Sequence, residues 1–230
     1  MLGILVILAI SWLLLYLFQK QHLWALGLRP NARQGKMILL GFVVTASLCV
    51  LDQLLEAFLK SAAWQVSETT QAMIILEAIY WDIKSVVTEE LLFRGALLYI
   101  LIQRIGVSKS VLLSGIAFGV YHWFSYGVLG SPWAMLFVFI GTGLMGYAWA
   151  LAFAKSKTIL LPIALHLGWN VVYNTFFSQG PLGELVFVLN QNTALNGGAA
   201  LIDFLSGMVI IPLLVLLFVI YGVKNAEHKE

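Results

Sequence analysis

Long apolar runs alternate with short polar connectors along most of the chain. A backbone in lipid must satisfy its own hydrogen bonds, and these runs lack the alternation typical of barrel strands. Each run is close to the roughly 20 residues that an α-helix needs to cross a bilayer. The pattern therefore predicts an all-α fold, a polytopic transmembrane bundle of seven or eight helices. The runs cover residues 2–18, 37–59, 85–102, 111–126, 133–154, 159–177 and 202–223.

Two segments leave the number of spans open. The segment 68–81 can be interpreted as an interfacial helix or as an eighth, short span. The loop 178–200 is rich in Gly and Asn, but its apolar stretch 185–189 is able to dip back into the bilayer. No internal repeat is visible, so residues 1–230 are expected to form a single integral-membrane domain.

The composition indicates that lipid is the main solvent. Hydrophobic residues make up 61% of the chain and charged residues only 10%, and the mean hydropathy of +0.93 lies outside the range of soluble domains. The net charge of +2 comes without a dense basic run, which excludes nucleic acid as an expected partner and leaves membrane lipids. The single cysteine, Cys49, cannot form an intrachain disulfide.

Basic residues in the connectors predict the orientation of the chain. A seven-span arrangement leaves Lys60 alone on one side, and the positive-inside rule then predicts a cytoplasmic C-terminus in a bacterial plasma membrane. An eighth span before residue 85 would reverse the first two helices. The basic residues on the other side are Lys20, Arg29, Arg33, Lys36, Arg104, Lys109, Lys155, Lys157, Lys224 and Lys229.

A first group of charged residues lies near the start of the run 85–102. Ionisable side chains are costly at membrane depth and therefore indicate function. Glu90 and Arg94 are four residues apart, which favours an ion pair that reduces the cost of burying both. Glu89 points about 100° away from Glu90 on a helix. A carboxylate in a dry site is a candidate general base towards water, although a lone membrane glutamate more often serves helix packing or a proton path.

Two further groups place histidine inside apolar runs. Phe118 and His122 are four residues apart, which puts them on one helix face, and His166 and Asn170 share that spacing. Histidine can bind a metal, share a proton with water or donate to an oxyanion, whereas asparagine only donates and accepts hydrogen bonds. If consecutive helices alternate in direction, Glu89 early in its helix and His122 and Asn170 late in theirs lie near one membrane face.

The three groups together resemble the CAAX protease and bacteriocin-processing family. The motifs Glu-Glu-x-x-x-Arg, Phe-x-x-x-His and His-x-x-x-Asn occur in this order, and all their positions match between Glu89 and Asn170. The resemblance implies an all-helical intramembrane endopeptidase with its catalytic core at about 84–178. Eukaryotic members remove the C-terminal tripeptide of prenylated proteins, whereas bacterial members are linked to peptide maturation, bacteriocin self-immunity and regulation.

The resemblance also implies roles for individual residues. Water would be activated by Glu89 and His122, and the oxyanion would be stabilised by His166 and Asn170. The supporting positions would be Glu90, Arg94 and Phe118.

The family is commonly described as metallopeptidases, which leaves the cofactor open. Zinc could be held by Glu89, His122 and His166 with an open position for water. A metal-free mechanism is equally coherent and is slightly preferred, because no base remains if Glu89 binds the metal.

The sequence therefore predicts an endopeptidase acting on a peptide or protein substrate at the membrane, either prenylated or similar to a bacteriocin or pheromone. Two other functions stay open: a proton or ion transporter, since buried Glu, Arg and His also build relays, and a non-catalytic scaffold or self-immunity protein. The basic residues place the site nearer the extracytoplasmic side, whereas prenyl-protein processing belongs to the cytosolic face, so these two expectations conflict.

Overall fold

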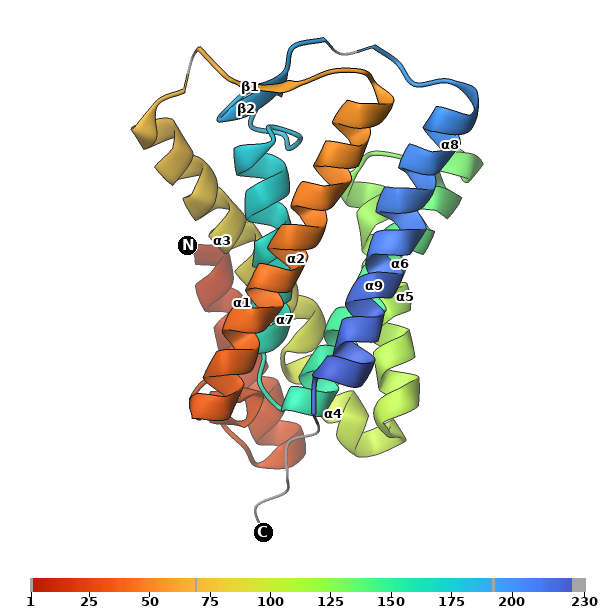
Figure 1. The fold of residues 1–230 in the computed structure, drawn as a ribbon. Coiled ribbons are helices and arrows are strands. Elements are labelled where there is room, and N and C mark those ends of the chain that lie inside the picture. The colour runs from red at the N-terminus through yellow and green to blue at the C-terminus, as the bar shows by residue number, and fades with distance from the viewer. Residues whose placement is uncertain (1, 69, 192, 225–230) are drawn as a thin grey trace.

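The computed structural model describes residues 2–68, 70–191 and 193–224, and it is almost entirely helical (Figure 1). Two short strands, β1 (Trp64–Val66) and β2 (Phe187–Leu189), are the exception within these ranges. The α-helices are α1 (Leu2–Gln19), α2 (Ala32–Leu59), α3 (Ala72–Arg94), α4 (Ala96–Ile105), α5 (Val107–Ser125), α6 (Pro132–Ser156), α7 (Leu160–Asn170), α8 (Gly197–Leu205) and α9 (Ile211–Leu217). A 3₁₀ turn precedes α2, and π-helical turns extend α7, α8 and α9: η1 (Leu23–Leu26), η2 (Val171–Phe176), η3 (Ser206–Ile210) and η4 (Phe218–Gly222).

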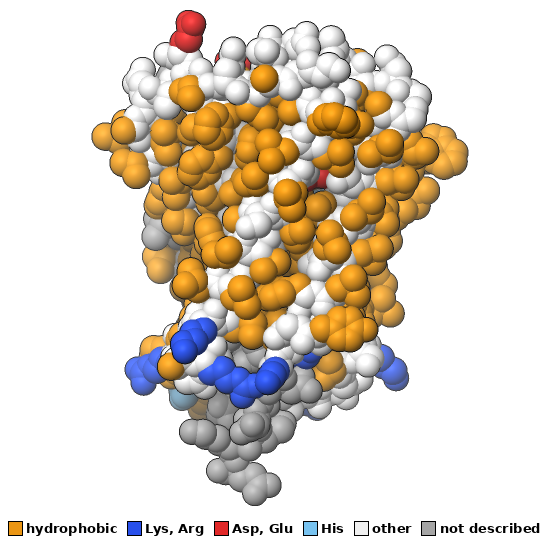
Figure 2. Space-filling model, viewed as in Figure 1, with side chains coloured by type: hydrophobic (Ala, Val, Ile, Leu, Met, Phe, Trp, Pro, Cys, Tyr) orange, Lys and Arg blue, Asp and Glu red, His pale blue; other side chains and the backbone are white. Residues whose placement is uncertain are grey.

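The bundle has the surface of an integral membrane protein. Among the described residues, four helical segments are long and apolar enough to cross a bilayer: Leu2–Gln19, Ala32–Leu59, Pro132–Ser156 and Gly197–Gly222. Hydrophobic side chains cover the middle of the visible face, and Lys and Arg side chains gather at the end where α1 ends and α2 begins (Figure 2). The predicted all-α membrane bundle is confirmed.

The apolar run 85–102 is not one helix, as the sequence predicted, but the end of α3 and most of α4. The chain breaks at Gly95, which has φ −80° and ψ −135°. A Cβ atom at Gly95 would collide with the carbonyl oxygen of Leu91, so only glycine fits this turn. The break lets the chain turn immediately after the first motif.

The segment 68–81 does not form a separate helix, because its residues 72–81 are the first turns of α3. Glu89 consequently lies near the end of its helix instead of near its start. The argument that placed Glu89 at the depth of His122 and Asn170 therefore rested on a wrong premise. Their actual relation is set by how α3 packs against α5 and α7.

Glycines allow α5 and α6 to approach closely. A Cβ atom at Gly119 would lie 2.8 Å from Cδ2 of Phe139, and one at Gly146 would lie 2.8 Å from Cβ of Phe118. Small residues permit such backbone approach within membranes, where dispersion forces drive helix association. The close packing brings the backbone of Gly146 next to Phe118, the first residue of the second motif.

Helix α7 is held against α2 by a similar contact. Gly168 lies between His166 and Asn170, and a Cβ atom there would collide with the carbonyl oxygen of Phe42 and with Oγ1 of Thr45. This face of α7 therefore packs on α2, while the buried His166 points towards α3.

The loop after α7 forms a strand and does not dip into the bilayer as residues 185–189 suggested. β2 pairs antiparallel with β1, with Trp64 opposite Leu189 and Val66 opposite Phe187. The pair lies at the end of the bundle opposite the Lys- and Arg-rich end (Figure 1). Pairing satisfies the backbone hydrogen bonds of both segments without a helix.

Candidate active site

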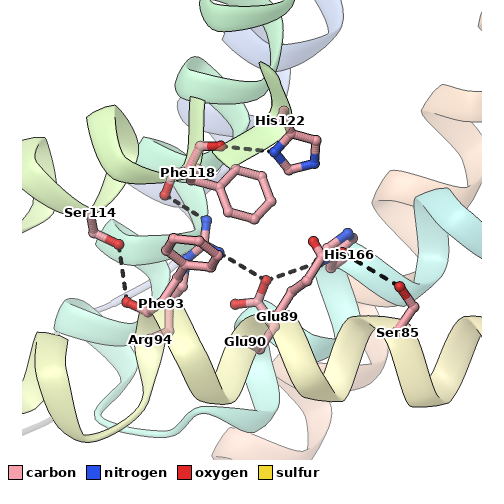
Figure 3. A network of polar contacts seen from close by, with 10 residues as sticks. Ser85, Glu89, Glu90, Phe93, Arg94, Ser114, Phe118, His122 and His166 are labelled. Carbon is pink, nitrogen blue, oxygen red and sulfur yellow. Dashed lines mark hydrogen bonds and ion pairs between the residues drawn. The ribbon is translucent and has the colours of Figure 1, made fainter. Parts of the chain in front are cut away.

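Glu90 lies at the centre of a buried polar network that joins α3, α6 and α7 (Figure 3). Its Oε1 accepts hydrogen bonds from Nη1 of Arg94 at 3.2 Å and from Nδ1 of His166 at 2.9 Å. Arg94 is fully buried as well, and its Nη2 donates to the carbonyl oxygen of Gly146 at 3.1 Å. The ion pair expected from the spacing is present, and it extends to a histidine of the third motif.

Phe118 packs between the groups of this network. The Arg94 guanidinium lies 4.2 Å from the centre of its ring, a cation–π contact that helps to compensate the buried charge. The ring centre of His122 is 4.3 Å from that of Phe118, and the ring centre of His166 is 6.1 Å away. Phe118, the first residue of the second motif, therefore contacts side chains from all three motifs.

Both histidines are held through the same ring nitrogen. His122 donates from Nδ1 to the carbonyl oxygen of Phe118 at 2.8 Å, since a carbonyl oxygen can only accept. His166 uses Nδ1 for Glu90, and its ring stacks on Trp149 with centres 4.0 Å apart. Each histidine therefore keeps Nε2 for another partner, with its ring orientation fixed by the protein.

Glu89 faces a cavity of about 300 Å³. The hydroxyl of Ser85 donates to its Oε1 at 3.4 Å, whereas its buried Oε2 has no hydrogen-bond partner among the described residues. Helices α1, α3 and α5 form the walls, with Gly3 and Tyr121 from the outer two. A buried polar atom without a partner is costly, and Oε2 of Glu90 and Nε of Arg94 share this property, but of these three residues only Glu89 lines the cavity.

Residues 70–172 match the family model of the type II CAAX prenyl endopeptidases, Rce1-like. The chain is Rce1-like over this segment. The resemblance inferred from the motifs is confirmed over this segment, which covers less than half of the chain, and the matched family is one of membrane peptidases of the CAAX type. No curated protein and no solved structure matches the chain.

The Rce1-like segment brings some of the expected site residues together and leaves others apart. Glu89 lies near His166, with which it interacts electrostatically (Figure 3). Of the described residues that line the cavity of Glu89, none is His122, His166 or Asn170. Asn170, at the end of α7, makes no side-chain hydrogen bond to any described residue. The four residues expected to be catalytic therefore share no single cavity in this structure.

The possible zinc ligands of the Rce1-like segment do not form a metal centre in this arrangement. Within residues 2–68, 70–191 and 193–224, no three His, Cys, Asp or Glu side chains are placed to hold one ion. Glu89, His122 and His166 thus do not fit a shared metal as they stand. The mechanism below uses only the side chains themselves.

A second polar contact between α3 and the end of α7 was missed from the sequence. Asp82 is fully buried, and its carboxylate accepts from Nδ2 of Asn174 at 2.6 Å and from Oγ1 of Thr175 at 3.1 Å. Asp82 lies eight residues before Glu90, and Asn174 lies eight residues after His166. The contacts of Asp82 with Asn174 and of Glu90 with His166 therefore join the same face of α3 to the same face of α7 and its extension. They flank Asn170, and the π-helical turn η2 begins directly after it.

Replacing Asp82 by alanine is expected to lower the free energy of unfolding by about 2–4 kcal/mol, because the Asn174 amide and the Thr175 hydroxyl lose their acceptor while buried. The midpoint of thermal unfolding in detergent measures the effect. The exchange Asp82→Asn with Asn174→Asp restores the pair and should recover most of the midpoint. Glu77→Ala, an exposed position of the same helix, is the matched control. Equal midpoints for wild type and Asp82→Ala would show that this contact contributes nothing.

Proposed function

We propose that the chain is an intramembrane endopeptidase that hydrolyses a peptide bond of a membrane-associated substrate at Glu89. The observation that carries the proposal is that Glu89 lines a cavity within an Rce1-like segment and keeps one carboxylate oxygen, Oε2, to which no described residue donates a hydrogen bond. Expected substrates are prenylated peptides or proteins and peptides of the bacteriocin or pheromone kind.

Glu89 acts as the general base in this proposal. A water molecule in the cavity loses a proton to Oε2, and its oxygen adds to the substrate carbonyl carbon, which gives a tetrahedral oxyanion. Collapse of the oxyanion breaks the carbon–nitrogen bond. The proton held by Glu89 passes to the leaving nitrogen, so the products are a carboxylic acid and an amine, and Glu89 returns to its starting state.

His122, His166 and Asn170 are the other residues with a proposed catalytic role. The Glu90 carboxylate holds Nδ1 of His166 and so fixes the ring, and in the proposed mechanism Nε2 donates a hydrogen bond to the oxyanion. The Asn170 amide supplies a second donor. His122, whose Nδ1 is fixed by Phe118, accepts a hydrogen bond from the attacking water at Nε2. These roles require the substrate-bound cavity to extend from Glu89 towards α5 and α7.

This mechanism needs no metal ion, and activity is therefore expected to survive chelation. Purified protein dialysed against 1,10-phenanthroline and EDTA should keep its turnover, because the Glu89 carboxylate can accept the proton of water at Oε2 without a Lewis acid. Elemental analysis of the same sample measures bound zinc. Stoichiometric zinc that is lost together with activity, and restores it when added back, would show that the metal-free mechanism is wrong.

The basic end of the bundle is proposed to face the cytoplasm of a bacterial cell, with the C-terminus on that side. The charges that support this lie in the first turns of α2 and α5, in the last turns of α4 and α6, and in the connectors after α1, α6 and η4; Lys229 lies outside the described residues. The first turn of α1 lines the cavity through Gly3 and Ile4, and α1 ends at the basic end. The start of α1 lies about midway between the two ends of the bundle (Figure 1), so we propose that the cavity opens sideways to lipid.

Comparison of peptides from cells that express wild type or Glu89→Gln tests the proposed function. Mass spectrometry should find short peptides that accumulate only with wild type, and their new termini identify the cleaved bond. A scaffold or self-immunity protein would keep its phenotype in Glu89→Gln cells and yield no such peptides. A transporter would instead carry protons or ions across liposome membranes.

A further inference from the structure

A cluster of aromatic and basic side chains that the proposed mechanism does not use lies at the end of α1. Trp12 and Tyr16 stack with ring centres 5.9 Å apart, and the ring centre of His22 lies 6.3 Å from that of Tyr16. The ammonium of Lys20 lies 5.1 Å from the centre of the Tyr16 ring. All four side chains of this α1-end cluster (Trp12, Tyr16, Lys20 and His22) are exposed, so they belong to the outer surface of the bundle.

The turn that ends α1 places Lys20 over Tyr16. Lys20 adopts the left-handed conformation with φ 55°. Its backbone N–H donates to the carbonyl oxygen of Tyr16 at 3.1 Å, and that of Gln21 donates to the carbonyl oxygen of Leu15 at 3.2 Å. These bonds are those of a helix that closes on its own last turn. The position of Lys20 is therefore fixed by the backbone as well as by the aromatic ring.

A hydrogen bond fixes the tautomer of His22. Nε1 of Trp12 donates to Nδ1 of His22 at 3.1 Å. An indole N–H can only donate, so Nδ1 accepts and the ring proton is on Nε2. Among the described residues, neither this N–H nor the ammonium of Lys20 has a hydrogen-bond acceptor. The cluster therefore offers two donors beside the same Tyr16 ring.

The charge of this region attracts anions. Four basic residues precede the first acidic residue of the chain, Asp52: Lys20, Arg29, Arg33 and Lys36. Lys and Arg side chains gather at the end of the bundle where α1 ends (Figure 2). Each basic residue near a membrane surface strengthens the binding of anionic lipid by about 5-fold. An anionic lipid headgroup is thus the anion that this surface meets in a bilayer.

The surface of α1 next to the cluster suits an acyl chain. Leu5, Ala9, Trp12 and Tyr16 follow one another at intervals of three or four residues and are all exposed, so they form one stripe along the helix. From Leu5 to Tyr16 the stripe is about 16 Å long. This length is close to half of the roughly 30 Å hydrocarbon core, the part that the acyl chains of one leaflet fill.

We propose that the α1-end cluster binds an anionic phospholipid, with Lys20 and Nε2 of His22 donating to its phosphate oxygens. Trp12 and Tyr16 lie at the level of the headgroups, where amphipathic aromatic rings are favoured. A zwitterionic lipid carries the same phosphate, but its own ammonium group competes with Lys20. Phosphatidylglycerol has no such group, so charge complementarity favours it over phosphatidylcholine.

Native mass spectrometry of the full chain tests the proposal. The protein in detergent is titrated with phosphatidylglycerol or with phosphatidylcholine of identical acyl chains, and the dissociation constant of the first bound lipid is measured. Phosphatidylglycerol is expected to bind about 10-fold more tightly. The measurement does not depend on turnover, so its result is independent of the proposed function.

Substitutions assign the preference to the cluster. Lys20→Gln should reduce the 10-fold preference to about 2-fold, whereas Lys20→Arg should retain most of it. His22→Phe keeps a ring beside Tyr16 but removes the donor, and it should weaken phosphatidylglycerol binding by about 2- to 5-fold. The matched control is Lys109→Gln, an exposed lysine in the first turn of α5, which should keep the full preference. Unchanged thermal unfolding midpoints show that each variant is folded.

Three outcomes would overturn the proposal. Equal affinity for the two lipids would show that the headgroup charge is not recognised. A preference that survives the combined Lys20→Gln and His22→Phe substitutions would place the lipid elsewhere. A loss in Lys109→Gln as large as in Lys20→Gln would show that the whole basic end attracts lipid without a defined site. Displacement of phosphatidylglycerol by an equal concentration of glycerol 3-phosphate would assign the cluster to a soluble phosphate and contradict the lipid assignment.

Discussion

Replacing Glu89 by glutamine is expected to lower kcat for a cleaved peptide by about 100- to 10,000-fold, the range that a general base contributes. Glutamine has nearly the same shape, and its oxygen can still accept the hydrogen bond from Ser85. The substitution removes the proton acceptor and changes little else. Because a charge is also removed from a largely buried position, the protein should accumulate in membranes at least as well as wild type.

Kinetics on purified protein in vesicles, with immunoblots of membrane fractions, measure both parts of this expectation. A lost base should lower kcat and kcat/KM together and leave KM almost unchanged, whereas a distorted cavity would raise KM. Glu77→Gln, an exposed carboxylate on the same helix, should behave as wild type. Wild-type turnover in Glu89→Gln would show that this carboxylate is not the base, and the proposed mechanism would fail.

The sequence predicted the fold class well because lipid constrains it strongly. Apolar runs of sufficient length must form helices in a bilayer, so most spans were visible as hydropathy alone. The break at Gly95 was not visible, since the apolar pattern continues from α3 into α4 without interruption. It depends on a steric contact with the carbonyl oxygen of Leu91, which composition does not encode.

Contacts within one helix turn were predictable at the candidate site, and contacts between helices were not. The pairing of Glu90 with Arg94 follows from their spacing. The hydrogen bond between Glu90 and His166 joins residues 76 positions apart, and it exists only because α3 packs against α7. The sequence therefore assigned Glu90 to support alone, whereas the structure places it against a residue expected to be catalytic.

Asp82 could have been found from its periodicity. Asp82, Val86, Glu90 and Arg94 are all buried and follow one another at four-residue intervals, so they form one face of α3. The face was hidden because the predicted span began at residue 85. His166, Asn170 and Asn174 have the same spacing across the end of α7, and two polar stripes at one spacing are a signal for a shared interface.

Replacing Arg94 by methionine is expected to lower the free energy of unfolding by about 3–5 kcal/mol, the usual cost of removing one member of a buried ion pair. Glu90 would remain fully buried with His166 as its remaining hydrogen-bond partner among the described residues, and the carbonyl oxygen of Gly146 would lose its donor. Arg94→Lys should recover only part of this loss, because a single ammonium cannot reach both acceptors and stack on Phe118 as the planar guanidinium does.

A double-mutant cycle separates the buried charge from the rest of the network. Glu90→Gln combined with Arg94→Met removes both charges, so the double variant should be more stable than Arg94→Met alone. Thermal unfolding in detergent measures all members, with Arg104→Met at the exposed end of α4 as control. The double variant should nevertheless stay impaired in turnover, because the neutral amide that replaces the Glu90 carboxylate makes a weaker hydrogen bond to Nδ1 of His166 and holds its ring less firmly. If the losses of unfolding free energy in Glu90→Gln and Arg94→Met add up to the loss in the double variant, Glu90 and Arg94 do not interact. If the double variant recovers turnover together with stability, Glu90 has no role beyond the fold.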